Sequence, residues 1–148
     1  MTGASDLRDA TAAYVSALEG LTPETLPAWR ALCAPDMLFR DPFNDAIGLD
    51  AAEGVFRKMF EDVSQISFRV LDSAVSGQNA YLRWRFDFHA RGRDWTIEGM
   101  SEIMFDERTR VVRHIDHWDA ASQFYETIPL LGSLIRAVKQ RLSAAPRS

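Results

Sequence analysis

One aspartate in an otherwise apolar, alternating run is the first candidate for chemistry. Val112, His114, Asp116 and Trp118 occupy every second position, so one face of a strand would carry all four. Burying a carboxylate costs free energy, and taking a proton from a substrate is one reason to place it there. The alternatives are a structural partnership with His114 or a helix cap, for which Asp119 is better placed.

Asp41 is the second candidate base. It follows Phe39 and precedes Pro42, where a strand should end because proline cannot donate to a sheet ladder. In a pocket with Phe39, Trp84 and Phe88, the Asp41 carboxylate would be prepared for proton transfer. In a turn, the same carboxylate would accept hydrogen bonds from nearby amides instead. The residues leave both roles open.

Histidine next to Asp116 suggests proton transfer more than metal binding. His114 could shuttle a proton, or it could be a hydrogen-bonded histidine of the strand wall. His114 and His117 point to opposite faces of a strand, so we expect no metal site. No glycine-rich phosphate loop is present, and we expect no cofactor. The single cysteine, Cys33, is expected to be a small buried side chain.

Apolar residues at helical spacing predict three helices in the first half of the chain. They begin after Ser5 and Asp6, after an N-cap at Thr22, and after a cap at Asp50. A C-terminal helix is predicted over residues 119–142, with a break near Pro129. Helices therefore bracket the region in which the candidate carboxylates lie.

Strands fill the remainder of the chain. A short strand over residues 36–40 and a turn over 44–48 lie between the predicted second and third helices. From Ile66 the apolar period changes to two, and three tight connections predict a four-stranded antiparallel meander that ends at Trp118. We expect an α+β domain with a cone-shaped, curved antiparallel sheet packed against three N-terminal helices, plus a C-terminal helix.

The aromatic side of the strand over residues 81–89 should face the interior. Burial stabilises each aromatic side chain by about 1.5–3 kcal/mol, whereas burying unpaired Arg83 or Arg85 would cost several kcal/mol. The interior of the cone is thus predicted to be an apolar pocket for a small molecule. Its predicted substrate-binding residues are Phe39, Trp84, Phe86, Phe88, Ser101 and Trp118.

Composition narrows the class of protein. The 148 residues are the size of one domain, predicted to span residues 1–148. A net charge of −4 argues against nucleic-acid binding, which needs a basic face. One cysteine and no recognisable signal peptide suggest a cytoplasmic protein. The basic C-terminal helix could lie on an anionic membrane, but cations also complement a helix C-terminus, and we expect no membrane association.

Three segments resemble one known superfamily. Residues 13–18 (AYVSAL), 39–42 (FRDP) and 111–119 (VVRHIDHWD) are similar to the nuclear transport factor 2-like, or SnoaL-like, proteins. This superfamily includes ketosteroid isomerases and limonene-epoxide hydrolases. The order and spacing of the segments are specific for the fold, whereas the fold hosts many functions.

The isomerase branch implies three roles. By this resemblance Tyr14 would donate to an enolate oxygen and Asp41 would be the general base. Ser101 stands where those enzymes keep a second oxyanion donor, a neutral aspartic acid, and a hydroxyl donates less strongly. From the sequence alone, Tyr14 is equally a core tyrosine with a satisfied hydroxyl.

The epoxide-hydrolase branch implies a different site. Residues 114–119 are similar to its last-strand motif, with Asp116 as the base, and Arg85 and Asp87 resemble its Arg-x-Asp pair. Asp41 and Phe39 stand where that branch holds water with Asn and Tyr. Arg85 and Asp87 lie on the face predicted to point outward, so they complete a triad only if the strand register slips by one residue.

The sequence therefore predicts a pocket protein with Asp41, Asp116, Tyr14 and His114 as catalytic residues. The reaction would be isomerisation, cyclisation or hydrolysis of a compact apolar molecule by general acid–base chemistry. The alternative is a non-catalytic binding or accessory protein for a hydrophobic ligand. We also expect a homodimer through the outer, charged face of the sheet.

Overall fold

The computed structural model describes residues 2–144. The chain forms two compact units, one up to Trp118 and one from Asp119 onward, and each is described by itself. The predicted single domain over residues 1–148 stays a prediction.

The first unit holds three helices and a sheet of six strands. Its elements are, in chain order, α1 (Ala4–Glu19), α2 (Leu26–Ala31), β1 (Cys33–Arg40), β2 (Asp45–Ile47), α3 (Leu49–Asp62), β3 (Ser64–Ser76), β4 (Asn79–Ala90), β5 (Arg93–Phe105) and β6 (Val111–His117).

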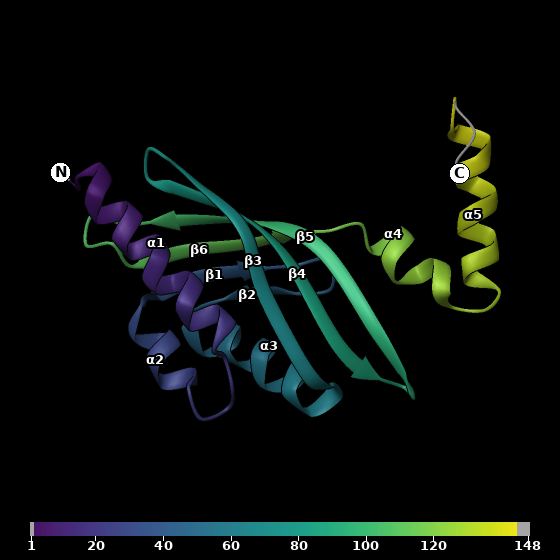
Figure 1. The fold of residues 1–148 in the computed structure, drawn as a ribbon, viewed down its shortest axis with the longest axis horizontal. Coiled ribbons are helices and arrows are strands. Elements are labelled where there is room, and N and C mark those ends of the chain that lie inside the picture. The colour runs from purple at the N-terminus through teal and green to yellow at the C-terminus, as the bar shows by residue number, and fades with distance from the viewer. Residues whose placement is uncertain (1, 145–148) are drawn as a thin grey trace. The chain divides into compact units, whose positions relative to one another are not determined.

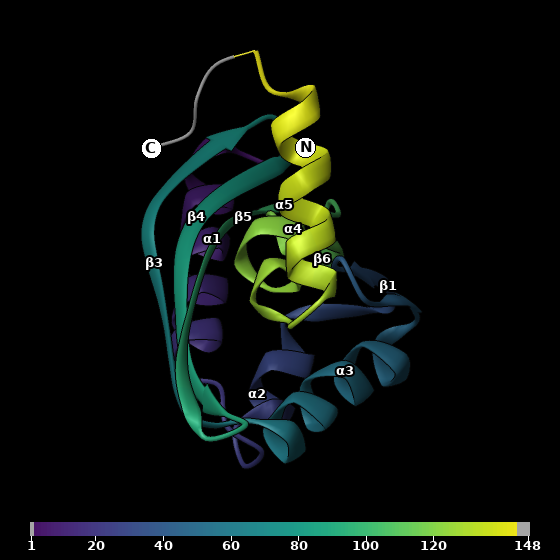
Figure 2. The ribbon, with the colours of Figure 1, turned by 90° about the vertical axis from the view of Figure 1, so that its right-hand side faces the viewer.

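The sheet is strongly curved, and the three helices lie on its concave side (Figure 1). Figure 2 shows α1 inside the curve of β3 and β4, with α2 and α3 below. The strand order is β2-β1-β6-β5-β4-β3. This arrangement confirms the α+β class and the curved sheet packed on three helices. The sheet is mixed rather than wholly antiparallel, because β1 runs parallel to β6.

Helices α1 and α3 begin and end close to the predicted positions. In α1 the Asp6 carboxylate accepts from the Gly3 N–H at 3.1 Å, and Gly20 ends the helix by donating to the Ser16 carbonyl. In α3 the N-cap is Gly48 rather than the predicted Asp50, which lies in the first turn. The apolar side of each helix faces the sheet, which gives the core its helical wall.

Helix α2 begins later than predicted. Thr22 and Thr25 exchange hydrogen bonds between each backbone N–H and the other's hydroxyl, at 2.8 and 3.2 Å. These bonds form a turn, so Thr22 is not the N-cap and the helix starts at Leu26. The following strand starts at Cys33 instead of residue 36, and its pairing with β6 is irregular between Cys33 and Leu38. Pro35 lies in this irregular stretch, where a missing N–H costs no ladder bond.

A short strand occupies part of the predicted turn over residues 44–48. β2 pairs with β1 as a hairpin, in which Phe39 is opposite Ala46 and Arg40 is opposite Asp45. Gly48 has φ +94°, a conformation that favours glycine, and it leads the chain from β2 into α3.

The predicted antiparallel meander is confirmed in β3 to β6. Arg91 and Gly92 both have positive φ, which is typical of the two-residue turn that joins twisted strands. A bulge between β5 and β6 puts Val111, rather than Val112, opposite Phe105 and into the core. The predicted inward face of β4 is also confirmed, since Leu82 and Trp84 are buried while Arg83 and Arg85 are exposed.

The second unit contains α4 (Ala120–Gln123), a single 3-10 turn η1 (Tyr125–Thr127) and α5 (Leu131–Leu142). Asp119 caps α4 by accepting from the Ser122 N–H at 3.0 Å, as predicted. The predicted break near Pro129 is also present, between η1 and α5. Within residues 2–144, no helix has the length and apolar character needed to span a lipid bilayer.

Candidate active site

Asp116 is the centre of a hydrogen-bonded chain on the inner face of the sheet. β5 and β6 pair so that Ser101 lies directly opposite Asp116. The Ser101 hydroxyl donates to Asp116 Oδ1 at 2.5 Å, and Ser101 is itself buried. Asp116 keeps 20% of its side chain exposed. The carboxylate is therefore held from one side and still accessible on the other.

His114 holds the same carboxylate oxygen. His114 Nε2 lies 2.7 Å from Asp116 Oδ1, and the imidazole is 97% buried, at 3% exposure. The two residues are two positions apart on β6, so their side chains share the inner face. Ser101 and His114 both contact Oδ1; within residues 2–144, Oδ2 of Asp116 accepts no hydrogen bond. Oδ2 is thus the atom that could take a proton from a bound molecule.

Tyr14 extends the chain from the helical side. Its hydroxyl lies 2.8 Å from His114 Nδ1, and it accepts from Trp29 Nε1 at 3.2 Å. Burial raises the pKa of Tyr14 well above its ordinary value, so the phenol keeps its proton. At 1% exposure the Tyr14 hydroxyl faces protein and not solvent.

Trp84 is the last residue at the other end of this series of hydrogen bonds. Its Nε1 donates to the Ser101 hydroxyl oxygen at 2.8 Å. Five hydrogen bonds therefore run from Trp29 through Tyr14, His114, Asp116 and Ser101 to Trp84. Five elements contribute to these hydrogen bonds, which tie α1 and α2 to β4, β5 and β6.

Aromatic rings lie on the same face of the sheet as His114 and Asp116. Phe39, on β1, packs against the His114 ring with a centroid distance of 4.9 Å. Along β4 the rings of Phe86 and Phe88 lie 4.9 Å apart, and both are half-buried. Trp118 is half-buried and contacts Phe43. Phe39 and Trp84 are fully packed, while Phe86, Phe88 and Trp118 keep apolar surface on which a molecule could rest.

Asp41 is used by the turn between β1 and β2. Its Oδ1 accepts from the Phe43 and Asn44 backbone N–H groups at 2.8 and 2.7 Å. The Asn44 side-chain amide donates to both carboxylate oxygens at 3.0 and 3.1 Å. This is the turn role that the sequence left open, and it makes Asp41 a weaker candidate base than Asp116.

Arg85 and Asp87 lie on the outer face of the sheet. They form an ion pair at 2.9 Å, and the Arg85 guanidinium together with the Thr96 hydroxyl holds the pKa of Asp87 below its usual range. The register of β4 against β5 is regular, with Phe86 opposite Ile97. Since no slip occurs, these two residues do not join Asp116 in an epoxide-hydrolase-like triad.

Trp29 is the residue in this series of hydrogen bonds that the sequence did not suggest as a site residue. In the sequence, Trp29 is one of several apolar residues at helical spacing between Thr22 and Pro35. Its indole N–H reaches Tyr14 because α2 packs against α1, and α2 is placed by tertiary contacts. A fully buried tryptophan close to a helix with a buried tyrosine is a weak signal, since the N–H must find an acceptor.

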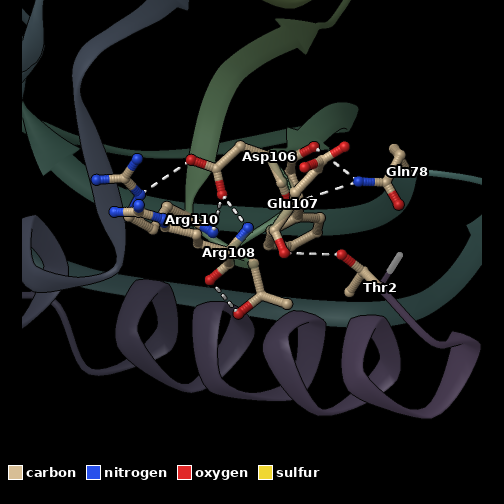
Figure 3. Close-up of polar contacts among 8 residues, drawn as sticks. Thr2, Gln78, Asp106, Glu107, Arg108 and Arg110 are labelled. Atoms are coloured by element: carbon tan, nitrogen blue, oxygen red, sulfur yellow. Dashed lines mark hydrogen bonds and ion pairs between the residues drawn. The ribbon is translucent and has the colours of Figure 1, made fainter.

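A groove of about 590 Å³ lies beside the turn between β5 and β6, away from Asp116. Figure 3 shows this turn, in which the Asp106 carboxylate accepts from the backbone N–H groups of Arg108 and Arg110 and from the Arg110 guanidinium. Burial opposes ionisation there, but these donors hold the pKa of Asp106 below its usual range. No predicted site residue lines the groove, whose walls are Thr2, Ala4, Leu7, Arg8, Val75, Gly77, Gln78 and Glu107.

Comparison with known proteins gives a family match over most of the first unit. A family profile described as a SnoaL-like domain matches residues 11–114. That segment includes Tyr14, Trp29, Ser101 and His114 and ends two residues before Asp116. No curated protein is significantly similar to this chain.

Solved structures share the fold at low sequence identity. An NTF2-like protein of unknown function from Burkholderia pseudomallei has a TM-score of 0.68 and 19% identity, and the match covers 78% of this chain and 92% of that protein. A protein of ketosteroid isomerase-like fold from Catenulispora acidiphila, in complex with trimethylamine, has a TM-score of 0.66 and 12% identity over 83% and 91% of the two chains. A protein from Shewanella denitrificans, provisionally assigned as a SnoaL-like polyketide cyclase, has a TM-score of 0.65 and 17% identity over 79% and 95%. At these identities the likeness concerns the fold.

Proposed function

Because the chain belongs to the SnoaL-like domain family, we propose that it is an acid–base enzyme in which Asp116 removes a proton from a compact, largely apolar small molecule. One observation carries this proposal. Asp116 is a partly exposed carboxylate on the inner face of the sheet, with Oδ1 held by Ser101 and His114 and with Oδ2 left to act.

The chemistry follows from that geometry. Oδ2 takes a proton from a carbon next to a carbonyl, and the electron pair of the C–H bond moves onto the carbonyl oxygen. In an unsaturated ketone the protonated Asp116 then returns the proton to the far carbon of the dienolate, as in an isomerisation. In a diketone the enolate carbon instead attacks a second carbonyl carbon, whose C=O π bond breaks to give an alkoxide that takes the proton from Asp116, as in an aldol cyclisation. In a hydrolysis the same oxygen would take its proton from water. Proton transfer by a carboxylate needs no cofactor.

Ser101 and Tyr14 support the base in this proposal. Resemblance to the isomerases implies that their hydroxyls stabilise an oxyanion. The Ser101 proton points to Asp116 Oδ1 and the Tyr14 oxygen lies next to His114, so each hydroxyl already has an acceptor. We therefore assign both to holding Asp116 and His114 in place.

The proposed substrate is an aromatic or polyketide-like ketone. Phe86, Phe88 and Trp118 present partly exposed rings, which favour a flat apolar molecule through ring-to-ring contact. Such a site orients a substrate by shape and by the position of its acidic C–H bond.

Deuterium exchange tests the proposal without knowledge of the natural substrate. α-Tetralone, β-tetralone and benzoylacetone are incubated with the protein in D2O, and loss of the α C–H signal is followed by proton NMR. We expect the wild-type protein to accelerate exchange of at least one compound. Asp116→Asn should lower that rate by roughly 10²–10⁴-fold, because the base is lost while the shape is kept.

Asp87→Asn is the matched control, since it removes a carboxylate from the outer face of the same sheet and should leave the rate unchanged. Binding of the same ketones without exchange, and with affinity kept within a few-fold in Asp116→Asn, would instead identify a non-catalytic binding protein. The half-exposed rings of Phe86 and Phe88 are the observation that favours this second function.

The homodimer is proposed through the outer face of β4 and β5. Tyr81 and Met100 are exposed there, at 38% and 50%. Charged residues of both signs surround them, including the Arg85–Asp87 ion pair, so the surface is self-complementary in charge. A cytoplasmic location stays a prediction.

A further inference from the structure

We propose that Tyr14 and Trp29 are positioning residues that fix His114 in one neutral tautomer, with the proton on Nε2, and that His114 in turn holds Asp116. This inference rests on the proposed role of Asp116 as the base. It replaces the oxyanion role that resemblance implies for Tyr14 with an action through His114.

Trp29 determines the direction of the first hydrogen bond. An indole N–H only donates, so Trp29 Nε1 gives its hydrogen to the Tyr14 oxygen at 3.2 Å. The Tyr14 proton is then free to point toward His114 Nδ1 at 2.8 Å. The Cys33 thiol also faces the Tyr14 hydroxyl, but sulfur is a weak acceptor compared with a bare imidazole nitrogen.

Asp116 determines the direction at the other side of the imidazole. An ionised carboxylate only accepts, so the 2.7 Å contact with His114 Nε2 requires a proton on that nitrogen. The Ser101 hydroxyl donates to the same oxygen. Both neighbours of His114 therefore select the same tautomer, with Nδ1 bare and Nε2 protonated.

Packing leaves the imidazole little room to change. His114 is 3% exposed, so water cannot replace either partner. The Phe39 ring lies 4.9 Å from the imidazole centroid, and the Tyr14 ring meets it edge-on at 5.7 Å. With the proton on Nδ1 instead, two lone pairs would face each other between Nε2 and Asp116 Oδ1, and the carboxylate would turn away from its present position.

The tautomer is measured directly by nitrogen NMR of the full-length protein labelled with ¹⁵N-histidine, at pH 8. The other two histidines, His89 and His117, serve as solvent-accessible references. We expect His114 to show one protonated nitrogen, Nε2, and one bare nitrogen, Nδ1. A proton on Nδ1 alone, or on both nitrogens at pH 8, overturns the inference.

Tyr14→Phe tests the tyrosine itself. The Tyr14 hydroxyl donates to the bare Nδ1 in this inference, so its loss should shift the ¹⁵N resonance of Nδ1 toward that of an imidazole nitrogen without a hydrogen bond. Tyr81→Phe is the matched control, because it removes a tyrosine hydroxyl from the outer face. An unchanged Nδ1 resonance of His114 in Tyr14→Phe would contradict the role of Tyr14.

The wild-type tautomer settles the matter even where Tyr14→Phe does not fold. The measurement needs no substrate, so it is independent of the deuterium exchange. If Nδ1 is bare but no ketone is exchanged, the proposed function is wrong while the inferred positioning of His114 is supported. If a ketone is exchanged but the proton lies on Nδ1, the proposed function is supported while the inferred positioning of His114 is wrong.

Discussion

Gly99 lies directly against the ring of Trp84. A Cβ at position 99 would be 2.8 Å from the Trp84 atoms Cη2 and Cζ2 and 2.7 Å from the His117 carbonyl oxygen. The two residues are paired across β4 and β5, so the absence of a side chain at 99 lets the indole lie flat on the strand. In this position Trp84 Nε1 reaches Ser101, and the candidate active site depends on that contact.

Gly99→Ala should therefore destabilise the protein and disturb the site. The added methyl group cannot fit, because backbone and a packed ring surround it, and overpacking of this kind costs about 1–3 kcal/mol. Denaturant unfolding measures the loss, and near-ultraviolet circular dichroism reports the movement of Trp84. Gly54→Ala is the control, since Gly54 is exposed in α3 with open space around it and should gain about 0.5–1 kcal/mol. Equal effects of the two changes would contradict this account.

Asp41→Ala should lower stability by about 1–3 kcal/mol through the turn. The change leaves the Phe43 and Asn44 N–H groups and the Asn44 amide without their acceptor. Asp41→Asn keeps one acceptor oxygen and should cost less. Denaturant unfolding compares the two variants. If Asp41→Asn leaves stability unchanged but abolishes the ketone exchange, Asp41 is the base and Asp116 is not.

Sequence periodicity was sufficient to predict the inner face of the sheet. Alternation along β4 and β6 predicted Trp84 in the interior and His114 beside Asp116, because strand geometry fixes which residues share a face. Local patterns also predicted the Arg85–Asp87 pair on the outside and the cap at Asp119. These features depend on neighbours within a few residues of each other.

Contacts between distant segments could not be predicted in this way. Tyr14 and His114 are separated by 100 residues, and their hydrogen bond exists because α1 packs onto the sheet. The parallel pairing of β1 with β6 also joins distant segments, and no hairpin turn in the sequence indicates it. For Asp41 the sequence offered two roles, and the choice depended on where the Asn44 amide points.

Cys33 should make stability fall at high pH. Burial raises the pKa of the Cys33 thiol to about 12 in the folded protein, whereas an unfolded thiol ionises near its ordinary value. A raised folded pKa means that this contribution is complete below the unfolded pKa, and it is lost as pH rises from about 9 toward about 12. Cys33→Ala should flatten the decrease measured by denaturant unfolding between about pH 8 and pH 10.

The raised pKa of Tyr14 acts in the same direction at still higher pH, so the variant should keep part of the slope. The native thiol should also react slowly with a thiol reagent such as Ellman's reagent at pH 8, since it is both buried and protonated. Rapid labelling of the folded protein would show that Cys33 is accessible and would remove the basis for this pH dependence.

Met100→Glu should convert the proposed dimer into a monomer. Met100 is half-exposed at the centre of the outer face of β5, next to Glu98 and Glu102, so a further carboxylate would repel the same surface of a second copy. Sedimentation velocity measures the change. Leu134→Glu is the comparison, because Leu134 is also an exposed apolar residue, on α5, at 62%. Dissociation by Leu134→Glu but not by Met100→Glu would place the interface on α5 rather than on the sheet, and a wild-type monomer would exclude both.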